Sequence, residues 1–428
     1  MGGSSMSTEH RRDHEDNRRQ VVVIGGGVIG LSAAYHLSRE GVEVTVLDSG
    51  EFGAGASWGN AGWIVPSLVH PFNVPKATPQ ALRAMLDPAG PIALRRTPTP
   101  DFVRWGLEFT RACRPDRSEQ SLRSLSGLAS TATTDMQRLA DEIGFECHRD
   151  GLLVPFRSEA ALEAYAAAHR HVEELGYTGR VERLDKEQVH RREPSLGGDV
   201  VGALRFLDEM SVRPDSLTDA LARAIRAGNG ETSRFERVSA ITRAAKGWHV
   251  ATTRRTLVAD AVVVAAGERT AGLLRPLGVR LSLQPGRGCS VLLQPEQLTL
   301  QQPLKIAEHR VACTPFENGQ VRISGTFDLT PIGAGPAVGR MRSVLRAAAT
   351  YLTALSDAEI SPSSVWSGAR PCTPDSVPII RQADRMSGLF IATGHGTLGV
   401  TLAPETGRRV ARLVTNALTT SHTQGVTH

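Results

Sequence analysis

The feature that most constrains the fold is the segment from Val21 to Asp48. Residues 21–24 are four β-branched apolar residues, a run that is too short for a helix and is typical of a strand buried on both faces. Apolar residues then recur at helical spacing over 28–37, and Gly41 follows where a C-terminal glycine would end a helix. Valines at 42, 44 and 46 predict a second strand. Together these elements predict a βαβ unit of roughly 30 residues, and hence an α/β fold with parallel strands.

The turn of this unit contains Gly25, Gly27 and Gly30 in the spacing G-x-G-x-x-G. The first glycine permits the tight turn, the second lets backbone approach a pyrophosphate, and the third lets the helix pack closely on the strand. The helix N-terminus presents backbone N–H groups at Val28 and Ile29, together with the positive end of the helix dipole, to the phosphates. The turn therefore predicts a dinucleotide site.

Asp48 ends the second strand, where its carboxylate can accept hydrogen bonds from ribose hydroxyls. A lone glycine pattern would be weak evidence, because a glycine-rich turn can also bind nothing. The strand, the helix and the acid in register favour the binding site. This unit alone leaves open whether the dinucleotide is FAD or NAD.

Composition limits the partners, the metals and the cellular location that we expect for the protein. A chain of 428 residues is long enough for two domains, and its net charge of +5 is not gathered into a basic stripe, so no nucleic-acid partner is expected. Five cysteines without C-x-x-C spacing indicate reduced thiols in a cytoplasm and argue against a zinc site, so no metal is expected. No apolar run reaches the ~18 residues that a membrane-spanning helix needs. Residues 1–20 lack the apolar core of a signal peptide, and we expect a disordered tail.

Residues 53–63 form a stretch of small residues with no helical or strand period, ending in Trp63. A flexible surface loop is one interpretation, but two tryptophans in this stretch would be costly to leave in water. Because the stretch follows the dinucleotide unit directly, we expect it to line the cofactor. The residues that we expect to contact the cofactor here are Ser57, Asn60, Ala61 and Gly62.

The middle of the chain predicts a separate α+β unit inserted into the dinucleotide fold. Short patterns such as 79–86 precede two longer predicted helices, Asp101 to Cys113 and Ser118 to Ile143. Strands at 151–156 and 201–206 flank a helix at 159–175. Over 281–327, several β-branched runs and an Asn-Gly hairpin turn at 318–319 predict an antiparallel sheet.

The α/β pattern returns in two places. A helix bounded by proline and glycine covers 214–228, and a buried strand at 260–265 opens into a second small-residue turn at Ala266 and Gly267. We therefore predict a dinucleotide-binding domain made of residues 20–75, 211–280 and 360–428. The substrate domain is then made of residues 76–210 and 281–359.

The C-terminal stretch decides between the two dinucleotides. A buried strand at 389–392 enters a Gly/Thr loop, and a helix leaves it. Small residues and a helix N-terminus present N–H groups to an electron-rich ligand, and a reduced isoalloxazine ring is such a ligand. A nicotinamide enzyme has no need of such a turn far from its phosphate loop, so the loop favours FAD. The residues that we expect at the flavin are Gly394, Gly396, Thr397, Leu398 and Gly399.

These stretches together resemble the FAD-dependent D-amino-acid oxidase and dehydrogenase superfamily, and most closely the bacterial D-amino-acid dehydrogenases. The resemblance runs from about residue 21 to the last helix, and it is carried by 23–31, 56–62, 263–267, 366–380 and 392–399. It implies a Rossmann-like FAD-binding domain interrupted by an α+β substrate domain with a large antiparallel sheet. It further implies that Val238 meets the adenine through its backbone.

Arg370 is the predicted substrate anchor. An arginine after a strand can hold an α-carboxylate through two parallel charge-assisted hydrogen bonds, and the resemblance gives this residue the same role. A surface ion pair is the alternative. His395, between glycines in the flavin loop, is a candidate for a catalytic or substrate contact, although a hydrogen bond to flavin or backbone would explain it equally well.

The function that follows is oxidation of a D-amino acid, with hydride transfer from Cα to flavin N5 and hydrolysis of the imine to a 2-oxo acid and ammonia. Electrons would pass to a quinone-type acceptor. The alternatives are a D-hydroxyproline or D-proline dehydrogenase, a glycine- or sarcosine-type oxidase that uses dioxygen, and a flavin-carrying binding protein without turnover. We expect a cytoplasmic protein and leave peripheral contact with the inner face of the membrane, and the oligomeric state, open.

Overall fold

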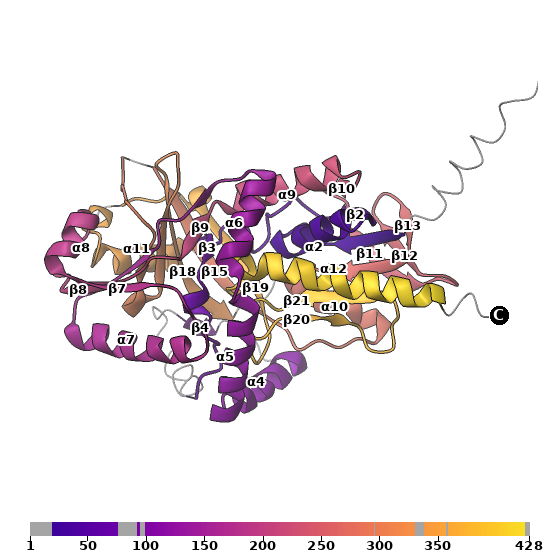
Figure 1. Ribbon diagram of the computed structural model, residues 1–428, viewed down its shortest axis with the longest axis horizontal. Coiled ribbons are helices and arrows are strands. Elements are labelled where there is room, and N and C mark those ends of the chain that lie inside the picture. Colours follow the sequence, from indigo (N-terminus) through magenta and orange to yellow (C-terminus); the bar gives the residue numbers. More distant parts are fainter. Residues whose placement is uncertain are drawn as a thin grey trace, which may run out of the picture.

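The computed structural model describes residues 19–75, 92–94, 99–294, 296–329, 338–356 and 358–423. Residues 1–18 of the predicted tail and all of the short pattern at 79–86 lie outside the described residues. Two sheets organise the rest, and Figure 1 shows them toward opposite ends of the long axis. None of the helices in the described part of the chain is both long enough and apolar enough to cross a bilayer.

The first sheet is the predicted α/β sheet. Its six strands are parallel except for β20, which pairs antiparallel with β21 at one edge. Helices cover one face, and α2 and α12 lie side by side in Figure 1. A small sheet of β11 (Val238–Arg243), β12 (Trp248–Thr252) and β13 (Thr256–Ala259) covers the other face. The strand order is β10 (Glu231–Ser233), β2 (Glu43–Leu47), β1 (Gln20–Ile24), β14 (Ala261–Val264), β21 (Leu389–Thr393) and β20 (Ile379–Gln382), and the helices are α2 (Val28–Arg39), α9 (Pro214–Ala227) and α12 (Gly399–Thr423).

The strand order positions the site. Strand β1 lies between β2 and β14, so the connections after β1 and after β14 leave the sheet side by side. In open α/β sheets, ligands bind in the crevice outside the carboxyl ends of strands at such a point. The glycine turn after β1 and the second small-residue turn after β14 both lie there.

The second sheet is large, mixed and mostly antiparallel. Its outer face packs on α11 (Val338–Ala349) in one apolar core. Its opposite face, which we call the inner face, is covered by α7 (Glu159–Glu174) over β6 and β8, and by the loop of residues 57–64 over β17 and β18. The order is β19 (Val365–Cys372), β15 (Gln284–Leu293), β18 (Val321–Leu329), β17 (Val311–Pro315), β16 (Leu304–Ile306), β6 (Leu152–Phe156), β8 (Gly202–Phe206) and β7 (Val181–Asp185), with β4 (Ile92–Leu94) against β18.

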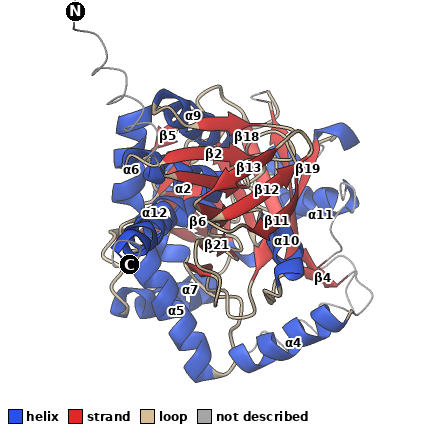
Figure 2. Ribbon diagram, turned by 90° about the vertical axis from the view of Figure 1, so that its right-hand side faces the viewer, coloured by secondary structure: helices blue, strands red, loops and turns tan. Residues whose placement is uncertain are grey.

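The other described helices and strands pack around the two sheets; α8, for example, packs on β7 and β8 of the large sheet. In Figure 2, helices α6, α2 and α12 lie to the left of the strands and α11 lies to the right, while α4 lies at the lower edge. The helices and strands not given above are β3 (Trp63–Ile64), β5 (Cys147–His148), β9 (Met210–Val212), α4 (Pro100–Ala112), α5 (Pro115–Ala129), α6 (Ala132–Ile143), α8 (Lys186–Arg192) and α10 (Thr270–Leu274).

The predicted fold class, an α/β dinucleotide fold with a large antiparallel sheet, is confirmed, but one predicted helix is wrong. The single helix expected from Ser118 to Ile143 is two helices, α5 and α6, that meet at Ser130 and Thr131. The Ser130 hydroxyl donates to the carbonyl of Gly127 at 3.0 Å, and such local hydrogen bonds compete with helix continuation.

The predicted domain boundary at residue 360 also differs from the sheet assignment. Strand β19 follows that boundary but belongs to the large sheet, because it pairs with β15 along its whole length. The chain returns to the α/β sheet only at β20. Burial does not mark this boundary by a simple alternation: β19 is buried at Val365, Gly368, Pro371 and Cys372, and β20 is half-buried throughout.

Candidate active site

The first glycine turn is as closely packed as its spacing predicts. Gly25 has a φ of +115°, and a Cβ on it would lie 2.3 Å from the carbonyl oxygen of Ala265. A Cβ on Gly30 would lie 1.9 Å from the Gly25 carbonyl oxygen. These contacts bring the turn after β1 against the turn after β14. Only glycine satisfies them, so the two turns form one surface at the carboxyl ends of the strands.

The N-terminus of α2 faces this surface, and the helix itself supplies neither an acidic residue nor a side-chain cap there. Gly27 is the N-cap residue and supplies no side-chain cap, and no acidic residue lies in the first turn. The Ser57 hydroxyl accepts a hydrogen bond from the Val28 N–H at 3.1 Å, which brings the loop of residues 57–64 to the helix end. A positive helix end lined by glycine and a hydroxyl is suited to a phosphate.

Asp48 lies beside the same turn. Its Oδ2 accepts from the Gly26 N–H at 2.7 Å, and its Oδ1 accepts from the Gly50 N–H at 2.8 Å. Burial raises the pKa of this carboxyl, and the two backbone N–H groups oppose that shift. Each carboxylate oxygen has a second lone pair, so the side chain retains acceptor capacity for a ribose.

The second and third turns complete a continuous cradle. Gly267 has a φ of +57°, and its carbonyl oxygen accepts from the Thr393 hydroxyl at 3.0 Å, which joins the turn after β14 to the end of β21. Gly394 and Gly396 have φ values of +84° and +53° and lead into α12, whose first turn contains no acidic residue. The side chain of Val238 is buried below the sheet with Leu47.

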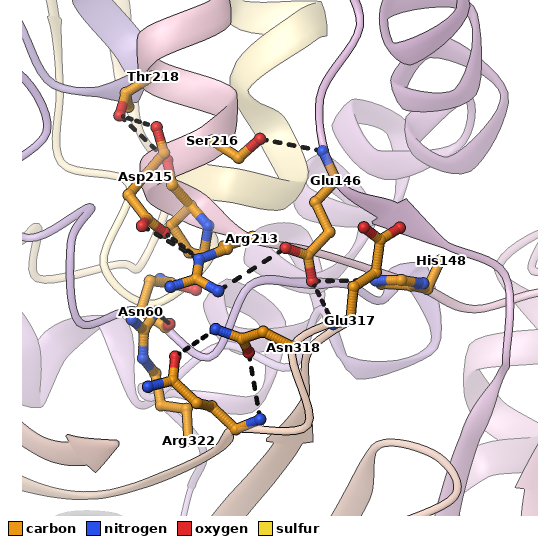
Figure 3. A network of polar contacts seen from close by, with 12 residues as sticks. Asn60, Glu146, His148, Arg213, Asp215, Ser216, Thr218, Glu317, Asn318 and Arg322 are labelled. Carbon is orange, nitrogen blue, oxygen red and sulfur yellow. Dashed lines mark hydrogen bonds and ion pairs between the residues drawn. The ribbon is translucent and has the colours of Figure 1, made fainter. Parts of the chain in front are cut away.

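The loop of residues 57–64 is attached to the inner face of the large sheet. Arg322 Nη1 donates to the carbonyl oxygen of Asn60 at 3.0 Å, and the Thr314 hydroxyl donates to that of Ala61 at 2.8 Å. Figure 3 shows Asn60 and Arg322 within a polar network that links the large sheet to the start of α9. The Asn60 side chain accepts from the Gly62 N–H at 2.8 Å and fixes the loop's own turn.

Arg370 lies near the end of β19, on the inner face. A Cβ placed on Gly288 of the neighbouring strand would lie 2.2 Å from both terminal nitrogens of the guanidinium, so the guanidinium rests on the bare backbone of Gly288. Its one hydrogen bond within the described part of the chain is a donation to the Thr326 carbonyl oxygen at 3.4 Å. No carboxylate of the described residues pairs with it, and burial lowers the pKa of the guanidinium. A cation without a counter-ion in a partly buried position is suited to an anionic ligand.

His395 is buried in the third turn. Its backbone forms an isolated bridge with Cys372, two residues after Arg370, and its Nε2 lies 3.0 Å from the Thr406 hydroxyl in α12. Burial lowers the pKa of His395 to about 3, so the imidazole is neutral near pH 7. The turn therefore brings a neutral histidine, not a cation, next to the strand that carries Arg370.

Two further features were missed by sequence reasoning. The Trp366 ring lies against Gly59, where a Cβ would meet it at 1.9 Å, and against Gly368, where a Cβ would meet it at 2.2 Å. The glycines Gly286 and Gly288, on the same face as Arg370, leave room for large side chains. The alternation of glycine with larger residues in 286–289 and 366–370 was the available signal.

The comparisons with known proteins agree with this geometry. The model of the family described as "FAD dependent oxidoreductase" (DAO) matches residues 20–413. The chain belongs to this family.

Relatives of this DAO-family protein include two bacterial D-amino acid dehydrogenases. That of Chromohalobacter salexigens is 31% identical over 410 residues, covering 92% of this chain and 95% of the relative. That of Cereibacter sphaeroides is 30% identical over 414 residues, covering 92% and 91%. Among solved structures, glycine oxidase from Bacillus cereus matches with a TM-score of 0.72 at 21% identity, covering 93% of this chain and 95% of that one, which shows the shared fold.

Membership in the DAO family makes the protein FAD-dependent, and the cradle fits that cofactor. The start of α2, which has no acidic residue in its first turn, suits the pyrophosphate together with Ser57, and Asp48 suits a ribose. The turns at Gly267 and Gly394, which a Cβ would strain, leave bare backbone for the flavin. Among the described residues, no group of three or more His, Cys, Asp or Glu side chains is arranged to hold a metal ion.

Proposed function

We propose that the protein oxidises a D-amino acid to its imine, which water converts to a 2-oxo acid and ammonia. The relatives at 30–31% identity are D-amino acid dehydrogenases, and this supports the substrate class. The observation that carries the proposal is Arg370, a partly buried guanidinium on bare backbone with no carboxylate partner among the described residues. Such a guanidinium can hold an α-carboxylate through two parallel hydrogen bonds.

The residues that we propose at FAD are those of the three turns and the attached loop. Bound FAD supplies the acceptor for the hydrogen that leaves the substrate Cα with its electron pair. Arg370 fixes the carboxylate and thereby orients Cα, and orientation of this kind contributes much of the rate. A substrate that enters with a neutral amine needs no protein base for the Cα step. We propose that His395 acts by position, through its hydrogen bond to Thr406, and holds the third turn in place.

The electron acceptor is proposed to be a quinone-type molecule. An open groove of about 820 Å³ lies between α4, α5 and residues 373–381. Its lining includes the apolar residues Ile379 and Ile380 and the charged residues Arg111 and Arg280. Thr373 belongs to this lining, and its methyl group would lie 2.6 Å from a Cβ on Gly394, so one chain segment separates the groove from the third turn.

We propose a cytoplasmic location with peripheral contact to the membrane that contains the quinone. No disulfide joins any of the five cysteines, all of which lie within the described residues, and this supports a reducing compartment. Measuring reoxidation of the reduced protein by dioxygen and by a water-soluble quinone separates an oxidase from a dehydrogenase. Faster reoxidation by dioxygen would overturn the quinone proposal.

The reaction is tested by anaerobic addition of substrates to the purified, FAD-loaded protein. D-alanine and D-proline are expected to bleach the visible flavin band, and their L-enantiomers are not. Bleaching by D-proline and D-hydroxyproline alone would favour the cyclic-substrate dehydrogenase, and bleaching by glycine or sarcosine alone would favour the oxidase. Failure of every compound, with FAD bound, would favour a binding protein without turnover.

Arg370→Lys tests the anchor itself. Lysine keeps the charge but cannot form two parallel hydrogen bonds to a carboxylate, so the Michaelis constant is expected to rise sharply with a smaller change in kcat. Arg226→Lys is the matched control, because Arg226 is exposed and its side chain bonds only the Thr232 hydroxyl among the described residues. An unchanged Michaelis constant for Arg370→Lys would remove this residue from the anchor role.

A further inference from the structure

Arg322 is a buried cation whose charge the protein does not neutralise. The residue lies on the inner face of β18 and is 4% exposed. Its one hydrogen bond within the described part of the chain is the donation from Nη1 to the Asn60 carbonyl oxygen. No carboxylate of the described residues lies within ion-pair distance of it. Burial lowers the pKa of Arg322 to about 10, so the side chain is still a cation near pH 7. An unpaired buried charge is costly, which calls for a compensating role.

The acids near Arg322 are engaged elsewhere, as Figure 3 shows. Asp215 pairs with Arg213 at 3.1 Å, and Glu146 lies 3.9 Å from Arg213 and accepts from the Glu317 N–H at 2.9 Å. The guanidinium carbons of Arg213 and Arg322 both lie 5.1 Å from the centre of the Phe316 ring. This network stabilises the β17–β18 hairpin and holds Arg322 in place. It leaves the guanidinium directed at the loop carbonyl.

The peptide between Asn60 and Ala61 is polarised by the Arg322 guanidinium. Its carbonyl oxygen faces Arg322, and the described residues contain no cis peptide bond, so the Ala61 N–H points the opposite way. The Ala61 carbonyl oxygen is held separately by Thr314. The Ala61 N–H has no partner among the described residues. A hydrogen bond to a peptide oxygen strengthens the donor at the other end of the peptide, by roughly 10–30% per bond.

We propose that Arg322 is a positioning residue for the cofactor, which fixes and polarises the Asn60–Ala61 peptide so that the Ala61 N–H donates to the flavin ring. A strengthened donor and a nearby cation both favour the reduced ring, because reduction adds negative charge to it. Arg322 thereby raises the reduction potential of bound FAD. This inference rests on the FAD site proposed above, and in particular on the placement of residues 57–62 at the flavin.

The test is the midpoint potential of bound FAD, measured by dithionite titration against a reference dye without any substrate. Arg322→Gln removes the charge, and we expect the equilibrium constant for two-electron reduction to fall about tenfold, which corresponds to a midpoint about 30 mV lower. Thr314→Val is the matched control: it removes two neighbouring hydrogen bonds to the same loop, one to the Ala61 carbonyl oxygen and one from Trp63 Nε1, but no charge. The control is expected to release FAD more readily at an unchanged potential. Equal potentials for Arg322→Gln and the wild type would overturn the inference.

Arg322→Lys keeps the test decisive if the glutamine variant does not retain FAD. Lysine keeps a charge but lacks the planar fork, so the equilibrium constant is expected to fall about threefold, or about 14 mV, relative to Thr314→Val. A lysine variant with the same potential as Thr314→Val would overturn the proposal. A wild-type protein that does not bind FAD would refute the site, whereas bound FAD with equal potentials would refute only the role of Arg322.

Discussion

Replacing Gly288 with alanine separates the anchor role of Arg370 from the stability of the fold. An ideal Cβ at residue 288 lies 2.2 Å from both terminal nitrogens of the guanidinium, and ordinary van der Waals contact begins at 3.4 Å. The atoms that must yield are the tip of a flexible side chain rather than backbone. The guanidinium is therefore expected to retreat by about 1.2 Å, the difference between those two distances.

The magnitude of the effect follows from that displacement. A misplacement of about 1 Å in a positioning group costs on the order of 10²-fold in rate. We therefore expect kcat/KM for a D-amino acid to fall about 100-fold in Gly288→Ala, or about 2.7 kcal/mol of transition-state stabilisation. The free energy of unfolding should fall by about 1 kcal/mol, the low end of the cost of overpacking, because the side chain can move aside.

The assay is steady-state oxidation of a D-amino acid with a dye as acceptor, alongside urea unfolding of each variant. Gly127→Ala is the control, because Gly127 lies in α5 and a Cβ there meets no atom within 4 Å. That variant should keep full activity. An unchanged kcat/KM in a folded, FAD-loaded Gly288→Ala would refute the placement of the carboxylate at Arg370.

Three further predictions follow from named contacts. Gly25→Ala places a Cβ 2.3 Å from the Ala265 carbonyl oxygen at a φ of +115°, so the purified variant should carry little or no FAD by its visible absorbance. Burial holds the pKa of His395 at about 3, whereas a histidine ordinarily has a pKa of 6.5. Below pH 6.5 the unfolded chain therefore takes up a proton that the folded chain excludes, and the wild type loses stability as the pH falls. His395→Gln should lose less stability than the wild type between pH 6.5 and about pH 4, as measured by urea unfolding at each pH. Arg340→Met leaves buried Asp328 without the arginine that binds it at 2.6 and 3.0 Å, and should lower the free energy of unfolding by about 3–5 kcal/mol. Equal stability of Arg340→Met and the wild type at neutral pH would contradict the last of these.

Local sequence patterns predicted much of the fold, because residue spacing and backbone preference within a short segment determine its strands, helices and turns. Strand β1, the glycine turn and α2 follow from a short β-branched run, three glycines and a 3.6-residue period, all within one βαβ unit. The Asn-Gly turn between β17 and β18 is likewise local, and Gly319 has the expected positive φ of +79°. The break between α5 and α6 was missed because serine and threonine end helices only weakly, and their effect depends on packing.

Sequence patterns pointed to the residues of the candidate site that lie in recognisable turns, and to Arg370 at the end of a predicted strand, but not to Arg322. Arg322 and Asn60 are 262 positions apart, and their contact depends on the register that places Arg322 on the inner face of β18. Shifting that register by one residue would turn Arg322 to the outer face. Gly288 lies beside Arg370 because β15 pairs with β19, and no local signal reports that pairing.

The arginines on the two faces of the large sheet differ in whether the fold supplies a partner for their charge. Arg340 packs on the outer side, where Asp328 binds its guanidinium through two hydrogen bonds, so its charge is matched within the fold. Arg322 and Arg370 lie on the inner face, and each bonds only a backbone carbonyl oxygen among the described residues. Burial lowers the pKa of both, and no carboxylate among the described residues forms an ion pair with either. Two unpaired cations on one face support the two proposals made above, in which a substrate carboxylate binds at Arg370 and the reduced flavin lies on the far side of the Asn60–Ala61 peptide from Arg322.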